Sequence, residues 1–222
     1  MITVIIPTYN EEKTIKKIIS GVKKYCDEIL VVGAKRSTDK TLEMAKSLGA
    51  KTIIDNGKGK GAAMRLSIDE AKGDILVFMD ADGSHITDDI PALLAPIKAK
   101  KADMVIASRM LGGSEELHGT VSQFFRMVFS AIITLIINYR FGVRITDSQN
   151  GFRAIRKDVA KSLGLNANIF DIETEMTMKC AKKGYRICEV PSRELNRVYG
   201  KSGINVLRMG PVYLWRVIVN IF

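Results

Sequence analysis

Two acidic residues follow an apolar run in DILVFMDADGSH, residues 74–85. Asp80 and Asp82 stand two positions apart, so a bend in the chain would turn both carboxylates toward one ion. Carboxylate oxygens are hard ligands that suit Mg²⁺ or Mn²⁺, and these ions also take substrate phosphate oxygens. A calcium loop of the EF-hand type is excluded because its twelfth position, residue 91, is proline. The pattern predicts a divalent metal site, and the alternative is a surface Asp-x-Asp turn.

Two further stretches have phosphate-binding character. In NGKGKGAAMR, residues 56–65, Gly57, Gly59 and Ala62 weakly fit a dinucleotide fingerprint. The acid that should end a second strand about 20 residues later is missing, which favours a flexible turn that presents Lys60 to a nucleotide. In VVGAKRSTDKT, residues 31–41, Asp39 either caps a helix or stands beside two basic residues that meet phosphate.

Strand and helix patterns alternate through the first half of the chain. We expect strands over residues 3–7, 28–32, 51–55, 74–80 and 102–108, and helices over 11–25, 38–49, 61–73 and 88–100. This alternation indicates a parallel sheet with helices on both faces, which binds ligands at the carboxyl ends of its strands. Three such ends should converge, and they carry Tyr9 with Asn10, Asp80 with Asp82, and Ser108 with Arg109.

The second half is more apolar. We expect helices over 122–142, 172–184 and 204–222, a loop, strand and helix start over 146–159, and a strand over 185–191. Gly210 and Pro211 should kink or break the last helix. The segments 120–141 and 204–222 could be core helices, an oligomer interface or membrane-surface helices, and arginines at their edges favour the membrane surface. Arg126 is a candidate anion clamp because it lies within an apolar helix.

Length and charge limit the class of protein. The 222 residues suit a single domain, and the net charge of +10 favours an anionic partner. Three separated cysteines match neither a zinc site nor a disulfide framework. We expect no signal peptide, and no clean membrane span because the best apolar run, Met127 to Ile137, has eleven residues. Basic and aromatic residues are not interleaved, so we expect no nucleic-acid partner.

Six stretches in order resemble the family-2 glycosyltransferases: VIIPTYNEE, STDKT, FMDADGSH, ASR, TDSQNGFRAIRKDV and EVPSRELNRVYGKS. More narrowly, they are similar to dolichyl-phosphate mannose synthases and to archaeal relatives that load glucose or N-acetylhexosamine onto dolichyl phosphate. The resemblance covers nearly the whole chain. It implies one catalytic α/β domain of the glycosyltransferase A type, with a Rossmann-like, mostly parallel sheet flanked by helices and with apolar interfacial helices.

The resemblance also implies a reaction and its residues. A hexose would pass from a nucleotide-diphosphate sugar to dolichyl phosphate, with Mg²⁺ or Mn²⁺, by a peripheral enzyme on the cytoplasmic membrane face. The implied donor-site residues are Pro7, Tyr9, Glu11 and Lys60 for the nucleotide, and Asp80, Ala81, Asp82 and Ser84 at the metal and diphosphate. The implied phosphate-binding residues are Arg109, Arg126, Ser130 and Arg197, with Asp147 as the acceptor-side acid.

Three departures from the resemblance keep alternatives open. The acids that relatives carry after the second strand are replaced by Gly33, Ala34 and two basic residues, which leaves the nucleotide undecided among GDP-mannose, UDP-glucose and UDP-N-acetylhexosamine. The late lysine of mannose synthases is absent, and Lys201 next to it is the expected substitute. The chain ends without appended membrane helices, which suggests a membrane-anchoring partner. A catalytically impaired nucleotide-sugar-binding scaffold is the alternative outside catalysis.

Overall fold

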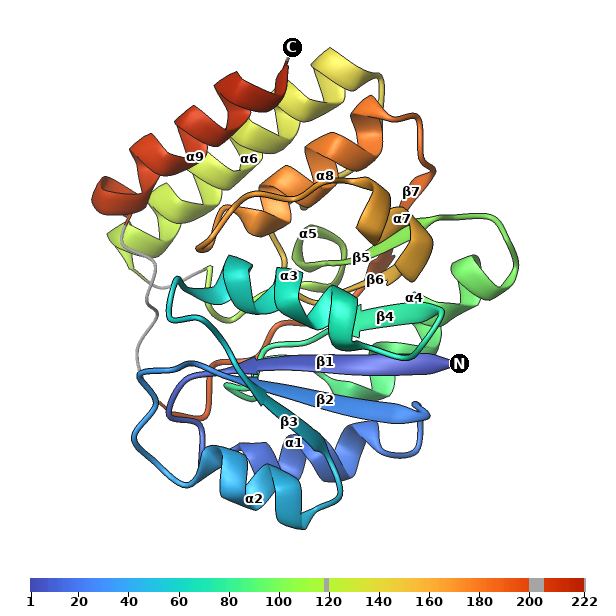
Figure 1. Cartoon of the computed structure of the whole chain (residues 1–222). Helices are drawn as coiled ribbons and strands as arrows, with labels where there is room; N and C mark the ends of the chain where they lie inside the picture. Colours follow the sequence, from blue (N-terminus) through green and yellow to red (C-terminus); the bar gives the residue numbers. More distant parts are fainter. Residues whose placement is uncertain (118–119, 200–205, 222) are drawn as a thin grey trace.

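A seven-stranded sheet forms the centre of this computed structural model, which describes residues 1–117, 120–199 and 206–221 (Figure 1). The strand order is β3-β2-β1-β4-β6-β5-β7. The strands are β1 (Ile2–Thr8), β2 (Glu28–Gly33), β3 (Lys51–Ile54), β4 (Ile75–Phe78), β5 (Met104–Ser108), β6 (Arg153–Arg156) and β7 (Ile187–Pro191). Only β6 is antiparallel to its neighbours, β4 and β5, so the predicted mostly parallel sheet is confirmed.

Helices cover both faces of the sheet because successive side chains of a buried strand point to opposite faces. On β1, Val4 and Ile6 pack toward one cluster and Ile5 packs toward the other. The helices on the first face are α1 (Ile15–Val22), α2 (Thr41–Ser47) and α4 (Ile90–Lys98). Those on the second face are α3 (Lys60–Glu70), α7 (Lys157–Ser162) and α8 (Ile172–Lys182). Two short elements, η1 (Thr87–Asp89) and α5 (Arg109–Gly112), follow β4 and β5.

Two long helices, α6 (Val121–Phe141) and α9 (Val206–Ile221), lie side by side over α8 as an outer layer (Figure 1). Thr120 accepts the N–H of Gln123 at the start of α6, and Gly142 ends it with a φ of 67°. The helix predicted over 122–142 is therefore confirmed. Of the kink or break predicted at Gly210 and Pro211, the break is wrong, because α9 continues through both residues. Proline removes a single hydrogen bond, whereas the following turns of α9 gain a packed apolar face.

The helix α6 is more apolar than the sequence analysis expects. By length and composition, Gln123–Phe141 could cross a membrane, with a mean hydropathy of 1.4 over its most apolar window. The expectation of no clean membrane span rests on the apolar run from Met127 to Ile137, but the longer stretch qualifies as a candidate because Arg126 and Asn138, which bound that run, do not lower its mean hydropathy enough. In the described part of the chain, α6 nevertheless packs through Ile133 and Ile137 into the cluster shared with α8 and α9.

Candidate functional site

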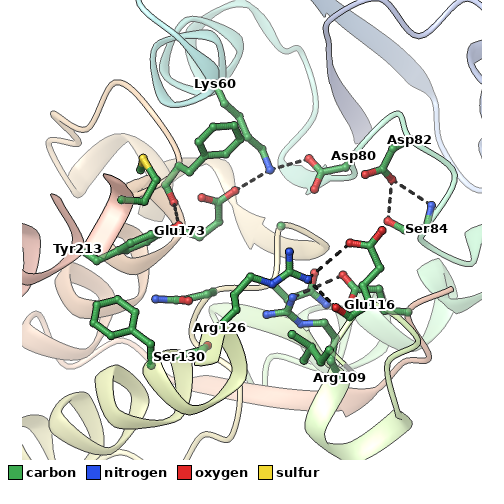
Figure 2. A pocket seen from close by; sticks show the side chains of 18 of the residues that line it. Lys60, Asp80, Asp82, Ser84, Arg109, Glu116, Arg126, Ser130, Glu173 and Tyr213 are labelled. Atoms are coloured by element: carbon green, nitrogen blue, oxygen red, sulfur yellow. Dashed lines mark hydrogen bonds and ion pairs between the residues drawn. The ribbon is translucent and has the colours of Figure 1, made fainter. Parts of the chain in front are cut away.

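A pocket of about 810 Å³, including the part open to solvent, lies where the carboxyl ends of β4 and β5 meet the outer layer. Figure 2 shows Lys60, Asp80 and Asp82 on one side of it and Arg109 and Arg126 on the other. The twenty residues that line it are Lys60, Asp80, Asp82, Ser84, Arg109, Glu116, Leu117, Arg126, Phe129, Ser130, Gln149, Asn150, Gly151, Phe170, Glu173, Glu194, Arg197, Met209, Gly210 and Tyr213.

Asp80 is held by a cation from the neighbouring helix. Lys60 Nζ lies 2.6 Å from Asp80 Oδ1 and 2.9 Å from Glu173 Oε1, and His85 Nε2 lies 3.5 Å from Asp80 Oδ2. Burial alone would raise the pKa of Asp80, but Lys60 and His85 together hold that pKa well below its ordinary value. A Cβ on Gly151 would come within 2.8 Å of Asp80 Oδ2, so only glycine leaves room there. Asp80 is therefore ionised and closely confined.

Asp82 is oriented by the turn that follows it. Its Oδ1 accepts the backbone N–H of Ser84 at 3.0 Å and the Ser84 hydroxyl at 2.7 Å. Gly83 occupies the turn with a φ of 81°, a conformation that glycine adopts without strain. The other oxygen, Oδ2, has a longer contact of 3.5 Å to Arg197 Nη1. One oxygen of Asp82 is thus fixed by its own turn, and the other faces the cationic side of the pocket.

Arg109 is fixed from behind by Asp147. Its Nε and Nη2 donate to Asp147 Oδ2 and Oδ1 at 2.6 and 2.9 Å, and Nη1 lies 3.5 Å from Glu194 Oε1. Burial would raise the pKa of Asp147, but Arg109 lowers it below its ordinary value. Asp147 does not line the pocket and is only 1% exposed. The predicted acceptor-side acid therefore does not face the pocket itself but supports residues that line it, Arg109 through its side chain and Gln149 and Asn150 through their backbone N–H groups.

The other two arginines share one carboxylate. Arg197 Nε and Nη2 donate to the two oxygens of Glu116 at 2.8 and 3.0 Å. Arg126 Nη2 donates to the Glu116 carbonyl at 2.9 Å and lies 3.6 Å from Glu116 Oε2. Ser130, one helical turn after Arg126, is buried in the same wall. All four predicted phosphate-binding residues thus line one pocket.

Of the predicted nucleotide residues, Lys60 lines the pocket, whereas Pro7, Tyr9 and Glu11 form a separate group at the end of β1. Tyr9 is 47% exposed, and the Arg36 guanidinium lies 4.6 Å from the centre of its ring. Burial, followed by the charge of Asp82, raises the pKa of Glu11 to about 7. Neither these residues nor Pro7 line the pocket, although Glu11 is electrostatically linked to it. Ala81 is buried and does not line it either, and its carbonyl accepts the Thr14 hydroxyl at 2.6 Å. Lys201 lies outside the described residues.

The glycines before α3 serve packing. A Cβ on Gly59 would lie 2.8 Å from the Asn168 carbonyl oxygen, and one on Gly61 would lie 2.6 Å from that of Ala167. Only glycine lets the start of α3 approach this segment, and the approach carries Lys60 into the pocket. This explains the sequence NGKGKG without a dinucleotide. Asp39 accepts N–H groups of Glu12 and Thr41, which supports the interpretation that it stabilises the start of α2.

Sequence reasoning missed three acids. Glu116, Glu173 and Glu194 are buried, line the pocket and pair with the predicted cations. Their sequence surroundings are ordinary loop and helix-start positions. The one available signal is indirect: several cations in one cleft need acidic partners nearby, so buried acids are expected among the other residues of the cleft. With them, five acidic and four basic side chains of the described residues line the pocket.

Comparison with known proteins places this geometry in a family. The model of glycosyl transferase family 2 matches residues 3–164. The chain is 31% identical to undecaprenyl-phosphate mannosyltransferase of Micrococcus luteus, over 95% of this chain and 94% of that protein. It is 30% identical to the low-salt glycan biosynthesis hexosyltransferase Agl6 of Haloferax volcanii, over 86% of this chain, and spans 46% of that protein's length.

Solved structures show the same fold. Glucosyl-3-phosphoglycerate synthase from Mycobacterium tuberculosis, in complex with Mn²⁺, uridine diphosphate and phosphoglyceric acid, superposes with a TM-score of 0.78. That comparison covers 100% of this chain and 78% of the other, at 21% identity. The fold is therefore that of the glycosyltransferase A type. The chain belongs to glycosyl transferase family 2 and is a nucleotide-sugar glycosyltransferase.

Proposed function

We propose that this chain transfers a hexose, with inversion at the anomeric carbon, from a nucleotide-diphosphate sugar to dolichyl or another polyprenyl phosphate. Mannose is the first choice of sugar, because the relative from Micrococcus luteus is named a polyprenyl-phosphate mannosyltransferase. Transfer of glucose or N-acetylhexosamine from a UDP-sugar is the second candidate. The nucleotide is left open because Gly33, Ala34 and two basic residues stand where relatives carry acids, and one of these, Arg36, lies over the ring of Tyr9.

The charge of the pocket is the observation that carries the proposal. Acids outnumber bases among its lining side chains, so two anionic substrates would not enter it together without a divalent cation. Asp82 Oδ2 and Asp80 Oδ2 have only contacts of 3.5 Å, whereas their Oδ1 atoms are fully engaged. A pair of carboxylates that leaves the other positions to phosphate and water suits Mg²⁺ or Mn²⁺. The described residues contain no ready group of three His, Cys, Asp or Glu ligands.

The residues divide the chemistry between them. Asp80 and Asp82 would hold the ion, which would neutralise charge on the leaving diphosphate. Ser84 orients Asp82 and remains a predicted ligand. Arg109 and Arg126 would position the acceptor phosphate for attack. A phosphate monoester has a second pKa of about 6 and is largely a dianion at neutral pH, so it needs no general base. Asp147 accordingly acts by holding Arg109 in place.

The outer layer supports a lipid acceptor. Phe129 and Ser130 of α6 and Met209 and Tyr213 of α9 line the pocket. The same two helices expose large apolar side chains to solvent: Val121, Phe124, Phe125, Ile132, Leu135, Tyr139, Leu214, Trp215, Ile218 and Val219. An amphiphile could place its phosphate in the pocket and its tail along these helices. We propose that this surface rests on the cytoplasmic face of the membrane, where a basic protein meets anionic headgroups.

The experiment has two stages. Thermal melting of the purified chain with each nucleotide sugar, with and without Mn²⁺, identifies the donor because a ligand of the folded state raises the melting temperature. Transfer of labelled sugar to dolichyl phosphate in vesicles then tests the acceptor, and flotation of the same vesicles tests membrane binding. We expect one donor to stabilise the chain only with metal. Stabilisation by a donor without transfer of its sugar would favour the impaired nucleotide-sugar-binding scaffold, and no stabilisation by any donor would contradict the proposed donor site.

A matched pair of variants tests the metal site. Asp82→Asn should lower metal-dependent transfer at least about a hundredfold, because a charged ligand and positioner of the diphosphate is lost. Asp88→Asn changes an exposed carboxylate that pairs with Lys24 outside the pocket and should transfer normally. Equal activity of the two variants would refute the assignment of Asp82.

A further inference from the structure

A carboxylate of the protein itself, that of Glu116, already pairs with two of the arginines in the pocket. Glu116 is 8% exposed and lies between Arg126 and Arg197, which come from α6 and from the segment after β7. Arg197 binds both carboxylate oxygens, and its backbone N–H also donates to Oε1 at 3.2 Å. Figure 2 shows Glu116 facing the interior beside Arg126. The carboxylate thus occupies guanidinium groups that a phosphate would use.

The backbone of Glu116 is fixed, so its carboxylate is not a mobile surface group. Ser114 and Glu194 form a parallel bridge, and Glu115 N–H donates to the Glu194 carbonyl at 2.8 Å. The Glu116 N–H donates to the Ser114 hydroxyl at 3.2 Å. The segment of residues 114–116 is therefore tied to the segment that carries Arg197. A ligand that reaches Arg126 and Arg197 must either displace the Glu116 side chain or share them with it.

We propose that Glu116 is a specificity-determining residue that restricts the acceptor to phosphate monoesters in their dianionic form. This inference rests on the proposed function. A neutral hydroxyl cannot replace a carboxylate on two guanidinium groups, because each guanidinium would lose a charged partner. A phosphodiester carries one negative charge, the same as the Glu116 carboxylate, so it gains no electrostatic advantage by displacing that carboxylate. A monoester dianion carries two charges and three acceptor oxygens, so it is the headgroup that can outcompete the carboxylate.

Selection of dianionic acceptors by Glu116 also explains why an acidic residue lies in a site that binds anionic substrates. With Glu116 in place, Arg126 and Arg197 stay neutralised and oriented when no acceptor is bound. Without it, each of the two guanidinium groups would lose one charged partner, and the discrimination between mono- and dianions would weaken. The expected signature is therefore a variant that binds phosphate esters more tightly but selects among them less well.

The test compares Glu116→Gln with the natural chain. Binding of methyl phosphate and of dimethyl phosphate is measured by calorimetry at pH 8 with Mn²⁺, so the two probes differ by one charge. The natural chain should prefer methyl phosphate. In the variant both probes should bind more tightly, with dimethyl phosphate gaining about tenfold or more and the gap between the two probes shrinking.

Glu115→Gln is the matched control. Glu115 is the neighbouring carboxylate and also binds the segment after β7, through Arg193 and Asn196, but it does not line the pocket. Its variant should keep the selectivity of the natural chain, and thermal melting checks that both variants fold. Weaker or unchanged binding in Glu116→Gln, or an unchanged gap, would overturn the inference. The assay needs no donor sugar or turnover, so failure of the proposed transfer would be seen separately.

Discussion

The buried pair of Arg109 and Asp147 supports a quantitative prediction for Asp147→Asn. Five donors converge on the two carboxylate oxygens: Arg109 N, Nε and Nη2, Gln149 N and Asn150 N. In the variant, the NH₂ group of the asparagine side chain must face some of these donors, with which it cannot form hydrogen bonds. The guanidinium of Arg109 then keeps a single carboxylate contact among the described residues, the 3.5 Å contact to Glu194. Breaking a buried pair in this way costs about 3–5 kcal/mol of unfolding free energy. Transfer should fall as well, because Arg109 loses its fixed position.

Urea denaturation measures the loss, and Asp158→Asn supplies the matched control. Asp158 also receives two hydrogen bonds from one arginine, Arg156, at 3.1 and 2.5 Å, but its side chain is 65% exposed. The control should lose less than about 1 kcal/mol. For a chain of this size, 3 kcal/mol corresponds to a fall of about 6–12 °C in melting temperature. Similar losses in the two variants would refute the claim that burial makes the Arg109 pair essential.

Two further predictions concern acid stability and room beside the metal site. Hydrogen bonds from Arg186, helped by the charges of Arg186 and Arg156, outweigh the opposing effect of burial and lower the pKa of Asp103 to about 2. Its stabilisation of about 2 kcal/mol is therefore present above pH 4 and is lost as the pH falls through 2. Urea denaturation from pH 5 to pH 2 should show that Asp103→Asn lacks this loss, and parallel curves for the two proteins would contradict it. Gly151→Ala would place a Cβ within 2.8 Å of Asp80 Oδ2 and 3.0 Å of Lys60 Nζ and should lower metal-dependent donor binding about tenfold in calorimetry, with thermal melting as the check that the variant folds.

The sequence predicts the fold well because its periodicity is strong. The alternation of apolar strands and helices places every strand of the parallel part near its observed position, and the helix predicted over 172–184 lies where α8 does. The antiparallel direction of β6 is not predictable in this way, since the apolar pattern of a four-residue strand does not depend on the direction of its pairing. Continuity of α9 through Pro211 is a tertiary effect of packing on α6 and α8.

The site is predicted less completely than the fold. The resemblance brings Asp80, Asp82, Arg109 and Arg126 to one pocket, as the structure has them. It does not reveal Glu116, Glu173 or Glu194, because the partner of a buried cation depends on three-dimensional proximity and not on spacing along the chain. For the same reason Asp147 looks from sequence like a substrate-facing acid, whereas in the structure it lies behind Arg109.

The position of β6 also bears on synthesis of the chain at the ribosome. One neighbour of β4 in the sheet, β1, precedes it in the chain, whereas both neighbours of β5, β6 and β7, follow it. About 45 residues separate the end of β5 from the start of β6, which corresponds to roughly 2–9 s of translation at typical speeds. During that interval the apolar strand MVIAS has two open edges and only α4 to cover one face. β6 pairs with both β4 and β5 and so connects them, and residues 149–151 just before it line the pocket.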